Sequence, residues 1–367
     1  MLHVRQWQDP LMGTVIREQD LGALVVGVTL LGSGGGGDTG AFGRMLRRRL
    51  GAGELVLRDA ADVTGVSVSP IGVVGATSVL MEKLPGGGEF DAAVRAVSRW
   101  TGTEVTGLMS LEAGGLNGLT PLIAALDLGL PVVDADLMGR ALPRLDQFSW
   151  AVAGRSLTPC ALSEPSGQVI VVDNVDAAGL ERAVRSFVAH TGGWAVLALA
   201  PTPVEAAAAD AVQGSLTRAL ALGRAHASLE PGATPAVVAE GLGGRLLGTG
   251  RVEEVARHLI GDGGAAFGRG SVCVVDTGSR AIIRIETENE YLLGLVDGTP
   301  VVTTPDLLCV LDRRTLQPIA VDAIRSGDEV LVLALPGPAW WRRPDRITHV
   351  GPQAFGLACA PQLMEAS

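Results

Sequence analysis

The sequence predicts an α/β protein with two domains: an N-terminal domain built on a mostly parallel sheet with helices, and an α+β C-terminal domain. Over the first 170 residues, short apolar runs alternate with amphipathic stretches, which is the pattern of strands joined by helical crossovers. After about residue 243, strand-like runs and turn sequences dominate, so this region is predicted to be β-rich. The length of 367 residues suits two domains, and we place them at 1–170 and 171–367.

In the N-terminal domain, predicted strands and helices alternate along the chain. Residues 25–31 form a β-branched apolar run that predicts a buried strand, and a glycine-rich turn and an arginine-terminated helix follow it. The first 20 residues predict a helix over the core or an arm. Because ligands bind beyond the carboxyl ends of strands in such sheets, the chemistry is expected in the loops after the strands. Further strands are predicted at 54–58, 66–74, 105–111 and 130–136, and helices at 89–101 and 119–128.

The C-terminal domain begins with helical sequence and then becomes rich in strands. A strand is predicted at 168–173 and a hairpin around Asp297-Gly298, which lies between two apolar runs. Glu288-Asn289-Glu290 precedes this hairpin, and exposed turn chemistry explains it as well as a role in covering a site does. Helices are predicted at 177–190 and 204–227, and a further strand at 329–335.

The main candidate for a ligand-binding loop is a glycine-rich segment, GSGGGGD at 32–38. Glycines let a ligand approach the backbone closely, and amides at a helix N-terminus favour an anion or a polarised carbonyl group. A tight turn without a ligand is one alternative, and a dinucleotide site with Asp59 or Asp62 as its acidic residue is another. We favour a loop that faces the substrate, formed by Gly34, Gly35, Gly36, Gly37 and Asp38.

Two further clusters follow predicted strands and carry candidate acid–base groups. In a glycine-flanked loop, Lys83 could hold a substrate carboxylate while Glu82 accepts a proton; a solvated surface pair is the alternative. Glu112 and Asn117 lie in LEAGGLNG directly after the strand at 105–111, which combines a carboxylate base with close approach of the backbone. Asn117 is also suited to cap the helix that follows.

Asp134, Asp136 and Arg140 form a third cluster. Residues two apart on a strand share a face, so the two carboxylates converge while the strand continues. Such a pair can coordinate a divalent cation, bind an N–H-rich ligand or share a proton. Alternatively, one aspartate caps the next turn and pairs with Arg140.

Composition narrows the function classes. The formal net charge of −10 argues against nucleic acid as a partner. The four cysteines are far apart, which argues against a disulfide framework or a cysteine-rich zinc site and favours a reduced, cytoplasmic chain. We expect neither a signal peptide nor a membrane span, because polar residues interrupt the N-terminal sequence and no apolar run is long enough. The mean hydropathy of +0.33 leads us to expect a homo-oligomer.

Several stretches together resemble one family. By these motifs the chain resembles the S-methyl thiohydantoin desulfurase-like family (DUF917), which is associated with hydantoinase- and oxoprolinase-type enzymes. The resemblance implies an N-terminal α/β domain, a β-rich C-terminal domain, and action on five-membered cyclic ureides such as hydantoins or thiohydantoins. The motifs occur in order over almost the whole chain: LGSGGGGDTGAFGRML, VGATSVLMEKLPGG, MSLEAGGLNGLTPL, LGLPVVDADLMGRALPRL, TPDLLCVLD, and ALPGPAWWR with VGPQAFG.

The chemistry that the resemblance implies is hydrolysis: water adds to an electrophilic ring carbon and a thiolate leaves. We expect Glu112 to act as the base and Lys83 as the charge partner, with the amides of residues 34–37 as carbonyl donors. Asp134 and Asp136 are expected to bind ring N–H groups or a metal ion that activates the water, and no nucleotide cofactor is favoured. The alternatives are a lyase, isomerase or cyclase for a related small metabolite, and a non-catalytic ligand-binding protein.

Overall fold

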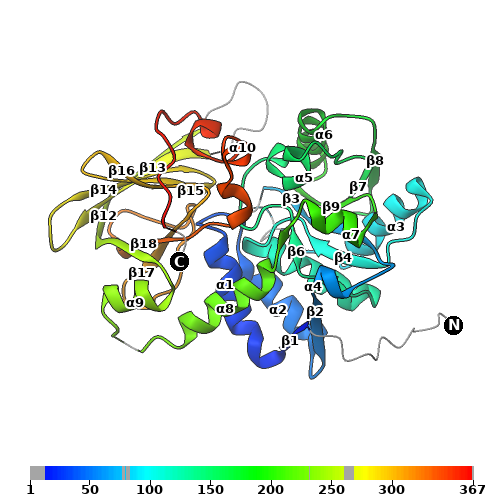
Figure 1. Cartoon of the computed structure of the whole chain (residues 1–367), viewed down its shortest axis with the longest axis horizontal. Helices are drawn as coiled ribbons and strands as arrows, with labels where there is room; N and C mark the ends of the chain where they lie inside the picture. The colour runs from blue at the N-terminus through cyan, green and yellow to red at the C-terminus, as the bar shows by residue number, and fades with distance from the viewer. Residues whose placement is uncertain (1–12, 77–78, 80–82, 231, 260–267, 366–367) are drawn as a thin grey trace.

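The computed structural model describes residues 13–76, 79, 83–230, 232–259 and 268–365, which form two main sheets with helices packed around them (Figure 1). The first sheet lies on the right in Figure 1 and the second on the left. This arrangement confirms the predicted α/β domain followed by a β-rich domain. Among these residues, no helix has both the length and the apolar character needed to cross a membrane.

The first sheet is mixed, with a parallel centre and antiparallel flanks. Its four central strands, β2, β5, β4 and β3, run parallel, as predicted for strands joined by helices. The flanking strands pair antiparallel, so the sheet is less uniformly parallel than predicted. The strand order is β1 (Gly13–Arg17), β2 (Glu54–Arg58), β5 (Val132–Val133), β4 (Gly107–Ser110), β3 (Ser67–Gly75), β9 (Trp194–Leu199), β7 (Cys160–Ser163) and β8 (Val169–Val172), and β10 (Thr202–Pro203) pairs with β3.

Helices cover both faces of this sheet. Successive residues of a strand point to opposite faces, and Val196 and Leu197 of β9 accordingly belong to different buried clusters. Two helices, α3 and α6, begin and end at the predicted residues. The helices associated with this sheet are α1 (Leu21–Leu31), α2 (Thr39–Leu50), α3 (Glu89–Thr101), α4 (Thr120–Leu128), α5 (Ser149–Val152), α6 (Ala177–His190), α7 (Val204–Ala209) and α8 (Ser215–Ala227).

Residues 25–31 belong to a helix, α1, so the predicted strand was wrong. The segment is apolar on all sides, so it carries little helical period for the sequence to reveal, although part of the helix is only half-buried. Helix α8 crosses it at very close range: a Cβ atom at Gly27 would lie 1.7 Å from the carbonyl oxygen of Ala219. The reciprocal contact, from Gly223 to the carbonyl oxygen of Ala23, is equally close. Tertiary packing thus overrides the strand preference of valine and threonine.

Three other predicted elements are divided or replaced. The predicted helix at 204–227 is interrupted by a short strand, β11 (Val212–Gln213), which pairs with β6 (Ala135–Asp136). The predicted strand at 130–136 is divided at Asp134 into β5 and β6. Of the first 20 residues, for which a helix or an arm is predicted, 1–12 lie outside the described residues, and 13–17 form β1, which pairs with β2. The other predicted strands and the hairpin at Asp297-Gly298 are present with small shifts in their ends.

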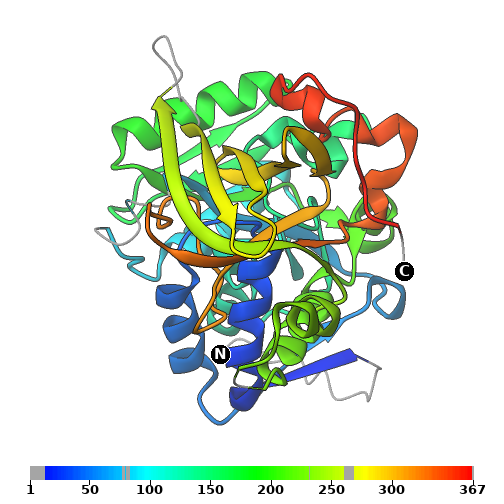
Figure 2. The same cartoon turned by 90° about the vertical axis from the view of Figure 1, so that its left-hand side faces the viewer.

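The second sheet has seven antiparallel strands and curves around a core of its own (Figure 2). Irregular pairing after Leu246 and after Val252 adds bulges to the long strand β12, which increases its twist. The strand order is β16 (Thr299–Thr303), β15 (Glu290–Val296), β14 (Ile282–Glu288), β13 (Gly268–Asp276), β12 (Arg245–Leu259), β18 (Glu329–Leu335) and β17 (Leu307–Asp312), with helices α9 (Pro235–Gly241) and α10 (Pro344–Ile347) outside the sheet.

The segment between the sheets packs with the first one. Strands β9 and β10 follow residue 170 in the chain but belong to the first sheet, and α8 packs on α1. The second sheet begins only at Arg245. Below, the N-terminal part means residues 13–230 and the C-terminal part means residues 232–365.

Candidate active site

A cavity of about 630 Å³ lies between the two parts. It is found at the carboxyl ends of β3 and β4, the edge of the sheet at which the sequence analysis expected a ligand. The glycine-rich loop and the start of β15 face it as well. Its main lining segments are 34–37, 73–76 and 111–112 from the N-terminal part, and 289–290 and 320–322 from the C-terminal part.

Glu112 lines this cavity from the loop after β4. The hydroxyl group of Ser110 fixes its backbone, because it accepts from the Glu112 amide (3.0 Å) and donates to the Glu112 carbonyl (2.6 Å). The side chain is 8% exposed, and no donor among the described residues hydrogen-bonds to its carboxyl group. Burial raises the pKa of Glu112 well above its usual value, and the nearby carboxyl groups of Glu290 and Asp136 raise it further.

Glu290 faces the same cavity from the C-terminal part, as the first residue of β15. It is 4% exposed, and its Oε2 atom is buried without a hydrogen-bond partner among the described residues. Burial raises its pKa to about 8, although the positive charge of Arg140 opposes the shift. The sequence left two explanations of this residue open, exposed turn chemistry and a role in covering a site. The signal for a site was its place beside a hairpin in a domain that could close over the first.

Together, Glu112 and Glu290 form a buried carboxyl pair with one member from each part of the chain. Each has a raised pKa, and the charge of Glu290 is the leading electrostatic influence on Glu112. Two carboxyl groups that interact in this way lose their protons in separate steps, which belong to the pair. A protonated and an ionised carboxyl group at one cavity are the components of general acid–base catalysis.

The glycine-rich loop lies against the start of β15. A Cβ atom at Gly35 would lie 2.4 Å from Glu290 Oε1, and one at Gly34 would lie 2.3 Å from the ring of Tyr291. The amides of Gly36 and Gly37 have no acceptor among the described residues, so they are available to a ligand. The loop therefore serves two purposes: Gly34 and Gly35 leave room for the C-terminal part, and Gly36 and Gly37 line the cavity.

Ser33 ties the same loop to the C-terminal part. Its carbonyl group accepts from the Tyr291 amide (2.7 Å), and its hydroxyl group donates to the carbonyl groups of Tyr291 and Leu308. The hydroxyl oxygen also accepts from the Leu308 amide at 3.0 Å. Ser33, which precedes Gly34, thus holds Tyr291, the residue that follows Glu290.

Asp38 and Asn117 have local structural contacts. Asp38 does not line the cavity; its side chain accepts from the Gly40 amide at the start of α2 (2.8 Å). Asn117 does line the cavity, but its amide group pairs with the backbone of Val73 in both directions, at 2.6 and 2.9 Å. It therefore extends the edge of β3 and does not cap α4, which was the alternative considered from the sequence.

Asp134 and Asp136 are buried, and protein donors use their oxygens. Asp134 accepts from the amides of Leu216 (2.8 Å) and Thr217 (3.0 Å), at the start of α8. Asp136 accepts from the hydroxyl group of Ser215 and from three backbone amides, those of residues 113, 138 and 139. The described residues contain no group of three His, Cys, Asp or Glu side chains that could hold a metal ion. The aspartate pair does not fit the metal site that the sequence suggested.

Arg140 is fully buried between the two parts. Its guanidinium group donates to backbone carbonyl groups, the shortest contacts being to Asp306 (2.7 Å) and Ala141 (2.9 Å). It forms no ion pair with Asp134 or Asp136. Burial lowers the pKa of Arg140 to about 10, and Glu290 is the charge that most opposes this shift.

Lys83 lies away from the cavity lining. Its ammonium group pairs with the buried carboxylate of Glu164 (2.7 Å) and donates to the carbonyl group of Thr191 (2.5 Å). Burial would raise the pKa of Glu164, but Lys83 and Ser166 hold it down at about 2. Glu82 lies outside the described residues.

Arginines from both parts also line the cavity. Arg144 and Arg269 pair with Glu288 at 3.6 and 2.6 Å, and Arg185 pairs with Glu181 at 2.7 Å. Because these residues come from distant stretches of the chain, no local motif in the sequence indicated them.

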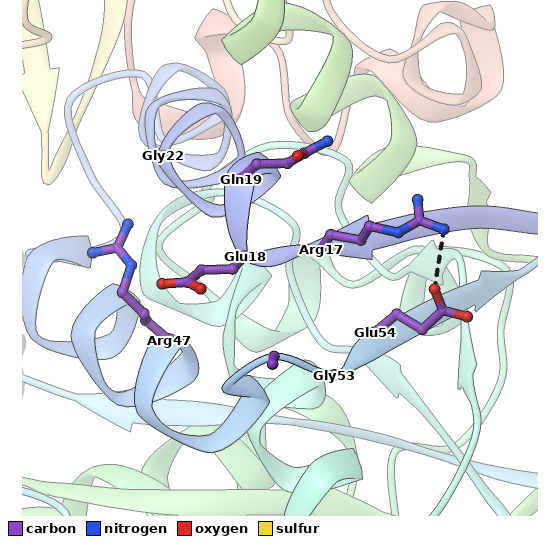
Figure 3. Close-up of a pocket in the computed structure, with 8 residues that line it drawn as sticks. Arg17, Glu18, Gln19, Gly22, Arg47, Gly53 and Glu54 are labelled. Atoms are coloured by element: carbon purple, nitrogen blue, oxygen red, sulfur yellow. Dashed lines mark ion pairs between the residues drawn. The ribbon is translucent and has the colours of Figure 1, made fainter.

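A second depression lies near the start of α1 and the end of α2 (Figure 3). Arg17 and Glu54 pair across it at 3.0 Å, with both side chains 55% exposed. Exposed ion pairs of this kind contribute little to stability or binding. The depression contains no buried polar group that would mark a binding site, so we assign the candidate site to the cavity between the two parts.

Comparisons with known proteins agree with this architecture. A family model described as the S-Me-THD-like N-terminal domain matches residues 19–174, and one described as the S-Me-THD-like C-terminal domain matches residues 175–362. A crystal structure of a protein from Chromobacterium violaceum is similar, with a TM-score of 0.77 and 23% identity over 95% of this chain and 98% of the other. At this identity, the similarity shows the fold alone. A search of curated proteins found no match.

Proposed function

The chain belongs to the S-Me-THD-like family, and on this premise we propose that it is an enzyme that hydrolyses the carbon–sulfur bond on a five-membered cyclic ureide ring of the S-methyl thiohydantoin type. The observation that carries the proposal is the pair of buried glutamates, Glu112 and Glu290. They face one cavity and both have raised pKa values. Among the described residues, no donor reaches the Glu112 carboxyl group or Glu290 Oε2. Such a pair can supply the acid and the base of a hydrolysis.

The two glutamates have different roles in this proposal. Glu290 is the member on which the charge of Arg140 acts more strongly, so it ionises first and removes a proton from the attacking water. Glu112 keeps its proton and donates it to the ring nitrogen. This assignment reverses the one made from the sequence, in which Glu112 is the base.

The proposed reaction has two steps, addition of water and loss of the thiol. Water adds to the ring carbon that carries sulfur, so a C–O bond forms, Glu290 takes the proton and Glu112 protonates the ring nitrogen. The C–S bond then breaks and the proton on Glu290 passes to the departing sulfur. The hydroxyl group that came from water returns its proton to Glu112 as the carbonyl group forms, and the ring nitrogen keeps its proton. The products are a hydantoin and methanethiol. The free amides of Gly36 and Gly37 support the proposal as donors to a ring carbonyl group.

The test is the release of methanethiol from an S-methyl thiohydantoin, measured with a thiol reagent, together with the mass of the ring product. We expect turnover by the wild-type protein and a loss of at least about a hundredfold in both E112Q and E290Q. Because the base ionises near pH 8, the rate is expected to rise through that pH.

The matched control is E89Q. Glu89 is also buried, but it binds the backbone at Gly86 and Gly87 and lies away from the cavity, so its variant should keep activity. Ligand stabilisation without any product would contradict hydrolysis and favour a binding protein. Conversion of the ring without consumption of water would favour an isomerase or cyclase.

A further inference from the structure

Arg140 carries a positive charge that no carboxylate neutralises directly. It is 0% exposed, and none of the ion pairs within 4.0 Å among the described residues includes it. Its five hydrogen bonds go to uncharged oxygens, including the carbonyl group of Tyr291 at 3.4 Å. Burial of a charge with only uncharged partners is costly, so a nearby negative charge stabilises the arrangement.

Most of the neighbouring acidic groups already have partners. Asp306 pairs with Arg342 at 2.6 Å, and Glu288 pairs with Arg269 and Arg144. Asp136 accepts four hydrogen bonds, and the thiol group of Cys309 lies against the carbonyl group of Leu30. Arg218 adds a second positive charge near Asp306. Among the described residues, neither Glu112 nor Glu290 forms an ion pair, Glu290 Oε2 has no donor, and both groups act electrostatically on Arg140.

We propose that Arg140 is a positioning residue that keeps one negative charge on the Glu112–Glu290 pair when the site is active and holds the backbone beside Glu290 in place. The proposal rests on the function proposed above and adds the charge state of the site. Two adjacent ionised carboxylates repel each other, and two protonated ones provide no base. A fixed cation beside the pair favours the state with one proton.

The geometry supports this role independently of charge. Arg140 and Ser33 both bind the carbonyl group of Tyr291, the residue next to Glu290. Arg140 also binds the backbone before β17, so one side chain of the N-terminal part contacts two segments of the C-terminal part. A planar guanidinium group donates to both segments from separate nitrogens in a fixed fork, whereas a lysine offers all its donors from one nitrogen.

The test is a ¹³C NMR titration of glutamate carboxyl groups in the full-length protein, with E112Q and E290Q to assign the two signals. In the wild type, we expect one of the two to ionise near pH 8 while the other stays protonated. In R140M, that ionisation should move upward by about one to two pH units. In R140K, which keeps the charge, the shift should be smaller.

The rate of thiol release provides a second readout. In R140M the rate near pH 7 should fall by about ten- to a hundredfold, in line with the shift of the base, and should recover at higher pH. A purely structural role would lower the rate equally at every pH. A native R140M protein with an unmoved titration would overturn the proposal. Ionisation of both glutamates below pH 6 in the wild type would also overturn the proposal. This outcome can be measured even if R140M does not fold.

The titration needs no turnover, so it separates the two proposals. If the wild-type protein releases no thiol but shows the expected titrations, the hydrolytic function is wrong and the role of Arg140 stands. If thiol is released but R140M titrates like the wild type, the hydrolytic function stands and the role proposed for Arg140 is wrong.

Discussion

The carboxyl group of Glu290 occupies the space that a side chain at residue 35 would need. The distance from an ideal Cβ atom at Gly35 to Glu290 Oε1 is 2.4 Å, which is shorter than any ordinary contact. The glycine-rich loop therefore packs against the start of β15 and also lines the cavity. The contact joins two segments that are far apart in the chain and places Glu290 near Glu112.

We expect G35A to displace Glu290. The added methyl group forces either the glutamate or the loop to move, so activity should fall by about ten- to a hundredfold and the free energy of unfolding by about 1–3 kcal/mol. Steady-state kinetics and urea denaturation measure the two effects. The control is G22A in α1, where a Cβ atom meets nothing within 4 Å; it should keep activity. Full activity in G35A would show that the position of Glu290 does not depend on the loop.

Glu290 should make the protein less stable as the pH rises. Its pKa is about 8 in the folded chain and ordinary in the unfolded chain, so the folded state binds more protons between about pH 4.5 and 8. The contribution of Glu290 to the free energy of unfolding is complete below that pH window. It is lost as the pH rises through the window, at up to about 1.4 kcal/mol per pH unit. Urea denaturation from pH 5 to 9 should show a shallower decline for E290Q. Parallel curves for the two proteins would mean that Glu290 is not buried in its neutral form.

Lys83 should matter for stability more than for catalysis. In K83M, the buried carboxylate of Glu164 loses its cation, so the free energy of unfolding at pH 7 should fall by about 1–3 kcal/mol. The double variant K83M/E164Q removes the unpaired charge and should recover part of this loss. The rate constant kcat should change by less than about threefold in both. A large fall in kcat without a change in stability would restore the catalytic role that the sequence suggested.

Asp134 should act as a cap for α8. In D134A, the amides of Leu216 and Thr217 lose their acceptor, which should cost about 1 kcal/mol and leave activity nearly unchanged. The matched control is D176A, which removes the N-cap of α6 and should cost a similar amount. Elemental analysis should give the same metal content for D134A and wild type. A stoichiometric metal that disappears in the variant would reinstate a metal site at these aspartates.

Local patterns gave good predictions where one face of an element is buried and the other is not. Helices α3 and α6 and the hairpin at Asp297-Gly298 show such patterns, and their positions were predicted closely. The pattern fails for α1, which is apolar on all sides, and for residues 204–227, where pairing of β11 with β6 interrupts a helical sequence. In both cases a long-range contact decides the local structure.

The same division applies to the site. Glu112, Asn117 and the glycines at 34–37, which the sequence offers as candidates, all line the cavity and lie in short local motifs. The sequence could not separate them from Asp134, Lys83 and Arg140, whose partners lie on distant segments. For the same reason, it left turn chemistry and a role in the site equally open for Glu290.

By itself, the sequence determined the family, the order of the two domains and the loops that face the cavity, because these depend on local periodicity and on motifs within short segments. Only the tertiary structure decided which carboxyl groups are free and which are bound. That distinction depends on the docking of the C-terminal part onto the glycine-rich loop, which buries Glu290 beside Glu112 and supplies partners to the other charged groups.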